Sequence, residues 1–263
     1  MLRNPIGILD SGSGGLSIWQ AVTNLLPHES VIYIGDHAHL PYSEKETIFI
    51  QDRVVRLIKF LRRLMVKLVI IACNTGTVAG IDVYRKAFPK LPIIGVVPVV
   101  KTAAQMSKTR RFAVLSTTYT AQSVYQQELI HKFARGCQVF NLGCPNLVTL
   151  VEKGQLSGKP VQREVRQILK PLEGRGVDVI ALGCTHYPFL RGVISDIVGH
   201  KVKILDSAGA VARQTHRVLE LNQAQVVWGR PKYQFFTTGN ARDMSQTFKL
   251  LLKRPVTVKQ VSI

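Results

Sequence analysis

Short runs of β-branched and other apolar residues alternate along this chain with longer segments that have a helical pattern. Four runs lie at residues 6–9, 31–34, 68–72 and 93–97, and four more at 112–115, 138–142, 177–182 and 202–205. Strand-like runs separated by helix-length segments are typical of a mainly parallel sheet flanked by helices. The alternation therefore predicts an α/β fold made of two such units.

An internal repeat supports the division into two units. Residues 6–11 resemble residues 112–117, and in each half a later apolar run ends in a small residue followed by a cysteine, Cys73 or Cys184. Crossings between the units are expected near residues 95–98 and 204–207. We expect a first domain of residues 1–97 plus 207–263, completed by Thr237–Asn240 and an amphipathic stretch at 248–252. The second domain is expected to span residues 98–206.

The composition is that of a folded protein. Of the 263 residues, 46% are apolar and 19% are charged, and there is no low-complexity tract. A membrane-spanning helix needs about 18 consecutive apolar residues, and the apolar runs here are much shorter. The first residues, Met-Leu-Arg-Asn-Pro, lack the apolar core of a signal peptide. We therefore expect a cytoplasmic protein with no membrane partner.

The formal charge of +19 is large. It fits nucleic-acid binding, attraction to an anionic surface, or steering of an anionic substrate. Part of it falls on a basic stripe that we interpret as the solvated face of an amphipathic helix: Arg53, Arg56, Lys59, Arg63 and Lys67. The sequence has no zinc finger and no basic stretch interleaved with aromatic residues, so the charge leaves nucleic-acid association open but does not indicate specific recognition.

Four cysteines are too few and too scattered for a disulfide scaffold: Cys73, Cys137, Cys144 and Cys184. None forms a Cys-x-x-Cys pair, and the pair Cys184 and His186 has no second pair at zinc-site spacing. We expect no metal site.

Cys73 and Cys184 each follow a predicted parallel strand, which is where ligands bind in open α/β sheets. A helix N-terminus or a nearby cation lowers the pKa of a thiol, so both cysteines are candidate bases. Inversion of configuration at a carbon can proceed by removal of a proton from one face and addition of a proton to the opposite face. Two acid–base groups on opposite sides of the carbon suit this reaction. Asp10 and His186 are candidates to assist the two thiols.

The loop Asp10-Ser-Gly-Ser-Gly-Gly15 follows the first predicted strand. Exposed backbone N–H groups in such a loop bind anions. The loop lacks the spacing of dinucleotide-binding and P-loop motifs, so a carboxylate is at least as good a ligand as a phosphate.

Several ordered motifs resemble the aspartate/glutamate racemase superfamily, and glutamate racemases within it. They are Asp10-Ser-Gly-Ser-Gly-Gly-Leu-Ser17, Tyr33-Ile-Gly-Asp36, Pro41-Tyr42, Ala72-Cys-Asn-Thr75, Gly95-Val-Val-Pro98, Leu150-Val-Glu152 and Gly183-Cys-Thr-His-Tyr-Pro188. The resemblance implies two pseudo-symmetric α/β domains with the active site in the cleft between them. It also implies a cofactor-independent enzyme that interconverts L- and D-glutamate, supplies D-glutamate for peptidoglycan and forms homodimers.

The resemblance also assigns site residues. By that likeness Cys73 acts on D-glutamate and Cys184 on L-glutamate, with Asp10, Glu152 and His186 assisting. The substrate-binding candidates are Ser11, Pro41, Tyr42, Ser43, Asn74, Thr75, Thr117, Thr118, Thr120, Thr185 and His186. Ser43, Tyr119 and Asn240 depart from the usual family residues, which are glycine, glycine and aspartate.

Three other functions remain open at this stage. The same machinery could act on aspartate or another acidic amino acid, because pocket walls set the substrate length. A basic protein that binds nucleic acid would explain the charge but gives the paired cysteines no role. A Cys-His hydrolase would use Cys184 and leave Cys73 without a role.

Overall fold

A computed structural model describes residues 4–263, so the first three residues of the segment considered above for a signal peptide lie outside the described part of the chain. The chain divides into two compact units. Unit 1 comprises the residues up to Val96 together with Ala208–Ile263, and unit 2 is Val97–Ser207. Each crossing lies one residue from the predicted boundary.

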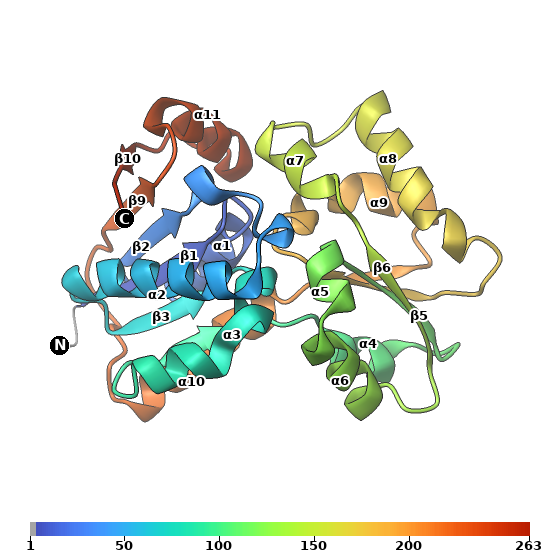
Figure 1. Cartoon of the computed structure of the whole chain (residues 1–263), viewed down its shortest axis with the longest axis horizontal. Coiled ribbons are helices and arrows are strands. Elements are labelled where there is room, and N and C mark those ends of the chain that lie inside the picture. Colours follow the sequence, from blue (N-terminus) through green and yellow to red (C-terminus); the bar gives the residue numbers. More distant parts are fainter. Residues whose placement is uncertain (1–3) are drawn as a thin grey trace. The chain divides into compact units, whose positions relative to one another are not determined.

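Unit 1 contains a six-stranded, fully parallel sheet in the order β10-β9-β2-β1-β3-β4 (Figure 1). Its strands are β1 (Ile6–Asp10), β2 (Val31–Gly35), β3 (Leu68–Ile71), β4 (Ile93–Gly95), β9 (Tyr233–Thr237) and β10 (Val258–Gln260). The strands β2, β1 and β3 are wholly buried and the edge strand β4 is mostly buried, in agreement with their continuous apolar runs.

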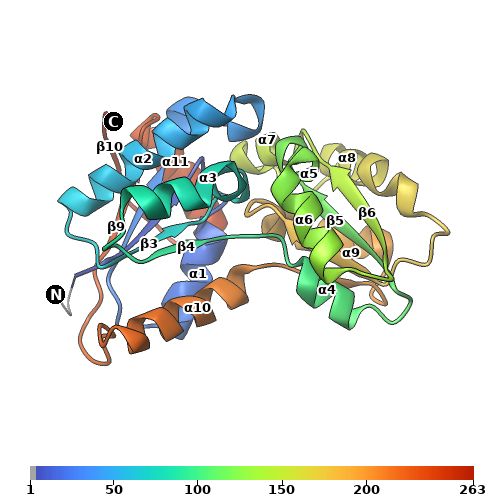
Figure 2. The same cartoon turned by 60° about the horizontal axis from the view of Figure 1, so that its bottom comes forward.

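Helices cover both faces of this sheet. They are α1 (Leu16–Leu25), α2 (Thr47–Arg63), α3 (Asn74–Ala87), α10 (Ala208–Leu221) and α11 (Ala241–Leu252), with the short 3-10 helices η1 (His37–His39) and η2 (Tyr42–Glu44). The helices α2 and α3 pack together on one face, and α1 packs with α10 on the other (Figure 2). Right-handed crossovers explain why α1 and α2 lie on opposite faces, because the connections β1-α1-β2 and β2-α2-β3 run in opposite directions along the sheet.

Unit 2 repeats the central part of that topology. Its four-stranded parallel sheet has the order β6-β5-β7-β8, which matches β2-β1-β3-β4 of unit 1. The strands are β5 (Arg111–Ser116), β6 (Gln138–Gly143), β7 (Val179–Gly183) and β8 (Lys203–Leu205). The sequence repeat thus corresponds to a repeat of strand order.

The helices of unit 2 also lie on both faces of its sheet. They are α4 (Val100–Met106), α5 (Thr118–Gln122), α6 (Val124–Phe133), α7 (Leu147–Glu152), α8 (Lys159–Leu169) and α9 (Arg191–Val198), with η3 (Lys170–Leu172) and η4 (Tyr187–Leu190). α4 packs with α6, and α8 packs with α9. Phe112, Val114, Val179 and Ala181 join Val100 of α4 in one buried apolar cluster.

Each sheet has one point where consecutive connections diverge to opposite faces. In unit 1 this point lies between β1 and β3, where Leu9 pairs with Ile71. In unit 2 it lies between β5 and β7, where Ser116 pairs with Gly183. Ligands of open α/β sheets bind outside the carboxyl ends of the strands at such points.

The predicted mainly parallel α/β fold is confirmed, and the structure differs from the expected elements in two respects. β9 and β10 are not among the strands expected from the sequence; β10 has only three residues and is an edge strand. The basic stripe is not wholly solvated, because the side chains of Arg53 and Lys67 are buried and form ion pairs with Asp36 and Glu29. Within residues 4–263 no helix has the length and hydropathy that crossing a bilayer requires.

Candidate active site

Cys73 lies directly after β3 and caps the N-terminus of α3. Its Sγ atom accepts a hydrogen bond from the backbone N–H of Gly76 at 3.2 Å and lies 3.5 Å from the Oγ atom of Ser11. An N–H donor at a helix N-terminus stabilises negative charge on the sulfur. The side chain of Cys73 is buried but not fully enclosed, with 6% of its surface exposed.

Asp10 and Ser11 bring the end of β1 to the same point. The Oδ1 atom of Asp10 accepts hydrogen bonds from Ser11 Oγ at 3.3 Å and from the backbone N–H of Gly12 at 2.9 Å. The Ser11 hydroxyl therefore lies between the Asp10 carboxylate and the Cys73 sulfur. The loop depends on glycine at position 15, where a Cβ atom would lie 3.0 Å from a carboxylate oxygen of Asp10.

Pro41, Tyr42 and Ser43 lie in the segment after β2. Tyr42 is buried and donates a hydrogen bond from its hydroxyl to Asp36 Oδ2 at 2.7 Å. Ser43 is half-buried, and no hydrogen bond of its side chain to another described residue is found. Asp36 is also fully buried. Burial alone would raise the pKa of Asp36, but hydrogen bonds from Arg53, Tyr42, Thr238 and His39 lower it below its usual range.

Asn74 and Thr75 form the first turn of α3 and are both buried. The amide Nδ2 of Asn74 donates to the carbonyl of Val96 at 3.4 Å. Its Oδ1 atom is buried and has no hydrogen-bond partner within the described chain. A buried acceptor without a partner is costly, so this atom is a candidate to receive a hydrogen bond from a ligand.

In unit 2, Cys184, His186 and Glu152 form a chain of contacts. The Nδ1 atom of His186 lies 3.7 Å from Cys184 Sγ, and its Nε2 atom lies 2.7 Å from Glu152 Oε1. Burial alone would lower the pKa of His186, but its contacts with Cys184 and Glu152 raise it well above the usual range. These contacts favour the protonated form of His186, which is held between two groups that carry or can carry negative charge.

The predicted threonines of unit 2 lie at the ends of β5 and β7. Thr117 caps α5: its Oγ1 atom accepts from the backbone N–H of Thr120 at 3.3 Å and contacts Thr120 Oγ1 at 3.0 Å. Thr185 lies between Cys184 and His186 in the sequence, and it is buried. Thr118 is half-buried, and its side chain has no hydrogen bond to another residue of the described chain.

The structure thus groups the predicted residues into two half-sites at equivalent places in the two sheets. We call Asp10, Ser11, Tyr42, Cys73 and Asn74 the Cys73 half-site. Thr117, Glu152, Cys184 and His186 form the Cys184 half-site. Ser11 and Thr117 occupy corresponding positions, each one residue past the end of a central strand and beside the cysteine that follows the neighbouring strand.

Sequence reasoning did not select three buried residues beside these half-sites. Tyr187 donates from its hydroxyl to the carbonyl of Cys144 at 3.0 Å. Asp36 and Arg53 form an ion pair next to Tyr42. Asp36 could have been selected from the sequence, since it follows a predicted strand just as Asp10 does. Arg53 could not, because in the sequence it resembles several surface cations.

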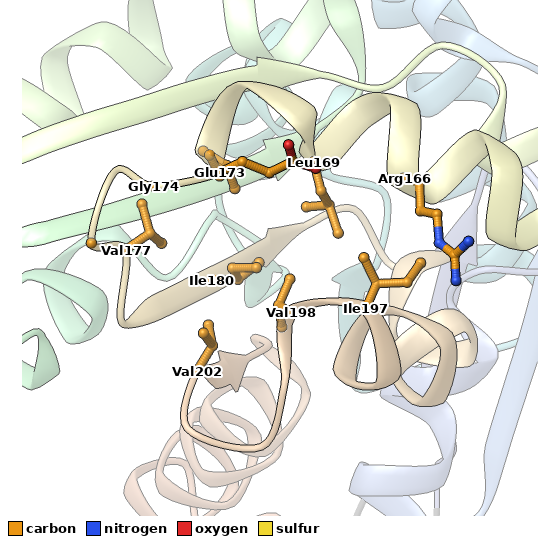
Figure 3. A pocket seen from close by; sticks show the side chains of 11 residues that line it. Arg166, Leu169, Glu173, Gly174, Val177, Ile180, Ile197, Val198 and Val202 are labelled. Atoms are coloured by element: carbon orange, nitrogen blue, oxygen red, sulfur yellow. The ribbon is translucent and has the colours of Figure 1, made fainter.

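A cavity of about 280 Å³ in unit 2 contains none of the predicted site residues (Figure 3). It lies at the amino end of β7, the edge opposite Cys184, and its walls combine apolar side chains with Arg166 and Glu173. Its lining residues include Leu169, Val177, Ile180, Val198 and Val202. Among residues 4–263 no three His, Cys, Asp or Glu side chains are grouped so that they could hold a metal ion.

The fold and the half-sites define a class: a doubled parallel α/β protein with a cysteine at the divergence point of each sheet, each in contact with a side chain that leads to a carboxylate. The chain matches the family described as Asp/Glu/Hydantoin racemase over residues 14–215. It therefore belongs to the Asp/Glu/hydantoin racemase family.

Similar proteins within this family are glutamate racemases. One from Pseudomonas putida KT2440 is 38% identical over 94% of this chain and 93% of its own length. One from Pseudomonas aeruginosa PAO1 is 34% identical over 98% of this chain and 97% of its own length. The crystal structure of glutamate racemase RacE1 from Bacillus anthracis superposes with a TM-score of 0.92 at 31% identity, covering 100% of this chain and 99% of its own.

A second solved structure includes a ligand. Glutamate racemase from Francisella tularensis in complex with D-glutamate has a TM-score of 0.88 at 28% identity and covers 100% of this chain and 98% of its own.

Proposed function

We propose that the protein is a cofactor-independent glutamate racemase that interconverts L- and D-glutamate. The observation that carries the proposal is the placement of Cys73 and Cys184 at equivalent divergence points, each in contact with its own acid–base partners. The family membership and the glutamate racemases among its relatives support the same reaction.

In the Cys73 half-site, the thiolate of Cys73 removes the α-proton of D-glutamate. The backbone N–H of Gly76 stabilises that thiolate, and the resulting thiol can pass its proton towards Asp10 through the Ser11 hydroxyl. The unpartnered Oδ1 atom of Asn74 offers an acceptor for the substrate ammonium group.

In the Cys184 half-site, the thiol of Cys184 gives a proton to the opposite face of the α-carbon, and L-glutamate results. The protonated His186 then restores the thiol or stabilises the thiolate, and Glu152 holds the imidazolium in place. The reverse reaction exchanges the roles of the two sulfurs. The mechanism requires both thiols to reach one α-carbon from opposite sides.

Racemase activity on purified protein tests this proposal. L- or D-glutamate is incubated with the enzyme without pyridoxal phosphate and with a metal chelator, and optical rotation is followed. We expect wild type to racemise glutamate, and Cys73→Ala and Cys184→Ala each to lose at least about a thousandfold in rate, because each removes a proton-transfer group.

Cys144→Ala is the matched control in this assay. Cys144 also follows a strand of unit 2, but burial raises the pKa of its thiol to about 12, so it stays protonated. The control should retain the wild-type rate within about twofold, the normal scatter for a residue outside the chemistry. Racemisation of aspartate in preference to glutamate, or unchanged activity of either cysteine variant, would refute the proposed function.

We further propose a cytoplasmic homodimer that supplies D-glutamate for peptidoglycan. Family membership supports this role, since the curated relatives are bacterial glutamate racemases. Light scattering on the eluted protein tests the dimer. Rescue of a D-glutamate auxotroph tests the cellular role.

A further inference from the structure

Unit 1 contains two buried ion pairs at opposite ends of the same sheet. Asp36 and Arg53 lie at the carboxyl edge, next to Asp10. Glu29 and Lys67 lie at the amino edge, just before β2 and β3. All four side chains are almost fully buried. Buried ion pairs are weak evidence for a gain in stability, so their positions deserve a separate explanation.

The Asp36–Arg53 pair has bidentate geometry. The Nε atom of Arg53 donates to Asp36 Oδ2 at 3.0 Å, and its Nη2 atom donates to Oδ1 at 2.9 Å. The Nη1 atom donates to the backbone oxygen of Ile263 at 2.6 Å. Paired, charge-assisted hydrogen bonds fix both the charge and the orientation of the carboxylate.

Asp36 joins this cation to the segment that carries Tyr42. Its carboxylate also accepts from Tyr42 Oη at 2.7 Å, Thr238 Oγ1 at 2.8 Å and His39 Nδ1 at 3.0 Å. Its backbone N–H donates to the carbonyl of Asp10 at 2.9 Å. The same residue therefore links the end of β1, the 40–42 segment and the end of β9.

Tyr42 in turn belongs to the Cys73 half-site and connects Asp36 to it. The helix η2, which begins at Tyr42, packs on α3, whose first turn follows Cys73. Burial and the negative charges of Asp36 and Cys73 raise the pKa of Tyr42 well above its usual range. The hydroxyl therefore remains a neutral donor to Asp36.

We propose that Arg53 and Asp36 are positioning residues for the Cys73 half-site, and that Arg53 offsets a carboxylate charge that would otherwise disfavour the Cys73 thiolate. This inference rests on the proposed racemase function for its kinetic part only.

The charges around Cys73 explain why a cation is needed. Asp10 at the end of β1 and Asp36 directly after β2 are carboxylates, and Tyr42 of η2 is neutral. Arg53 of α2 supplies a permanent positive charge, and the neighbouring imidazoles are those of His37 and His39 of η1. The first turn of α3, Asn74–Gly76, carries no ionisable group. Without Arg53 the negative charges would oppose the formation of a thiolate.

The Glu29–Lys67 pair provides a matched control within the same sheet. Lys67 Nζ lies 2.6 Å from Glu29 Oε2, and the exposed fractions of the two side chains are 5% and 1%. Glu29 also accepts from the backbone N–H of Val226, and Lys67 also donates to the carbonyl of Ala224. Breaking this pair disturbs a buried charge as severely as breaking the other, but at the edge remote from Cys73.

The kinetic experiment compares Arg53→Met and Asp36→Asn with Lys67→Met and Glu29→Gln in the full chain. All four variants should lower the melting temperature. We expect Arg53→Met and Asp36→Asn to lose about ten- to a hundredfold in kcat/KM for glutamate, mainly through KM, because a misplaced Tyr42 segment binds substrate poorly. Lys67→Met and Glu29→Gln should stay within about threefold of wild type, since remote sites act independently.

Arg53→Lys gives a further check if Arg53→Met folds poorly. Lysine keeps the positive charge but cannot form the bidentate pair. Compared with Arg53→Met, Arg53→Lys should therefore restore thiolate formation at Cys73 but only part of the substrate affinity. Equal kinetic losses for Arg53→Met and Lys67→Met would overturn the proposal.

A second readout does not depend on racemase activity. In chains whose other three cysteines are replaced by alanine, the rate of Cys73 alkylation by iodoacetamide is measured against pH. Arg53→Met should move this profile to higher pH, whereas Lys67→Met should leave it unchanged. An unmoved profile would refute the electrostatic role of Arg53 even if wild type proved inactive on glutamate.

Discussion

Ser11 and His186 show that the two half-sites serve their cysteines by different chemistry. Cys73 contacts a hydroxyl that leads to Asp10, whereas Cys184 contacts the imidazole of His186, which leads to Glu152. The repeat explains the shared position of the sulfurs, and the residues around them have diverged. The difference implies that the two proton transfers respond differently to pH.

Replacement of Glu152 by Gln tests the role of the imidazolium. Glu152 helps to raise the pKa of His186, so its loss should lower that pKa. The proton of His186 would then be lost at lower pH, and the alkaline limb of the kcat/KM profile should move to lower pH. At neutral pH we expect a loss of about tenfold to a hundredfold, which is within the range for general acid–base groups.

Glu164→Gln is the control for this prediction, because Glu164 lies on α8 and accepts a hydrogen bond from Asn146 at the surface. NMR titration of the His186 ring in both variants shows directly whether the pKa of His186 is lowered. If neither the pH profile of kcat/KM nor the titration of the His186 ring shifts in Glu152→Gln, Glu152 does not have this role.

At the scale of elements, helix termini fix several of the important side chains. Cys73, Thr117 and Asn240 each cap a helix through a side-chain acceptor. Asn240 accepts from the backbone N–H groups of Arg242 and Asp243 at the start of α11. Neither hydrogen bond involves a residue of the Cys73 half-site, so we expect the contribution of Asn240 to be measurable as stability alone.

We expect Asn240→Ala to lower the free energy of unfolding of the protein by about 1 kcal/mol, because two N–H groups lose their acceptor. Asn240→Asp should keep the wild-type stability, since aspartate is an equally good cap. Chemical unfolding and glutamate turnover are measured on the same preparations. A loss of activity per folded molecule in Asn240→Ala would contradict a purely structural role.

The elements differ in how well the sequence predicted them. The eight predicted strands are present because buried parallel strands give continuous apolar runs, although most of their ends moved by a residue or more. β9 and β10 give weaker signals, since Lys259 and Gln260 of β10 are exposed. Arg53 could not be recognised as buried, because its partner Asp36 is distant in sequence and its spacing matches that of the exposed cations.

The candidate site was predictable where motifs are local. Cys184 and His186 are two residues apart, so their contact follows from one motif. The contact of His186 with Glu152 depends on how α7 packs, which residue patterns do not encode.

At the scale of the whole molecule, the formal net charge is +19. The burial of Arg53 and Lys67 does not change this net charge, because each is paired with a carboxylate and the two charges of each pair cancel. A positive field concentrates an anionic substrate such as glutamate near the protein. The charge is therefore expected to affect substrate capture rather than turnover.

Raising the salt concentration from about 0.01 M to about 1 M, which shortens the Debye length from about 30 Å to about 3 Å, should lower kcat/KM for glutamate. The value of kcat at saturating glutamate is the internal control and should change little. If kcat/KM does not depend on the salt concentration, the charge does not assist substrate capture.

The central claim is that two opposed thiols, rather than one group, carry the proton. The most direct measurement is racemisation of L-glutamate in D2O, stopped early, with deuterium at the α-carbon determined separately in the two enantiomers. The account predicts deuterium in the D-glutamate formed and almost none in the remaining L-glutamate, because Cys184 removes the proton and a solvent-exchanged Cys73 returns a deuteron. Equal deuterium in both enantiomers at early times, or protium retained in the product, would contradict it.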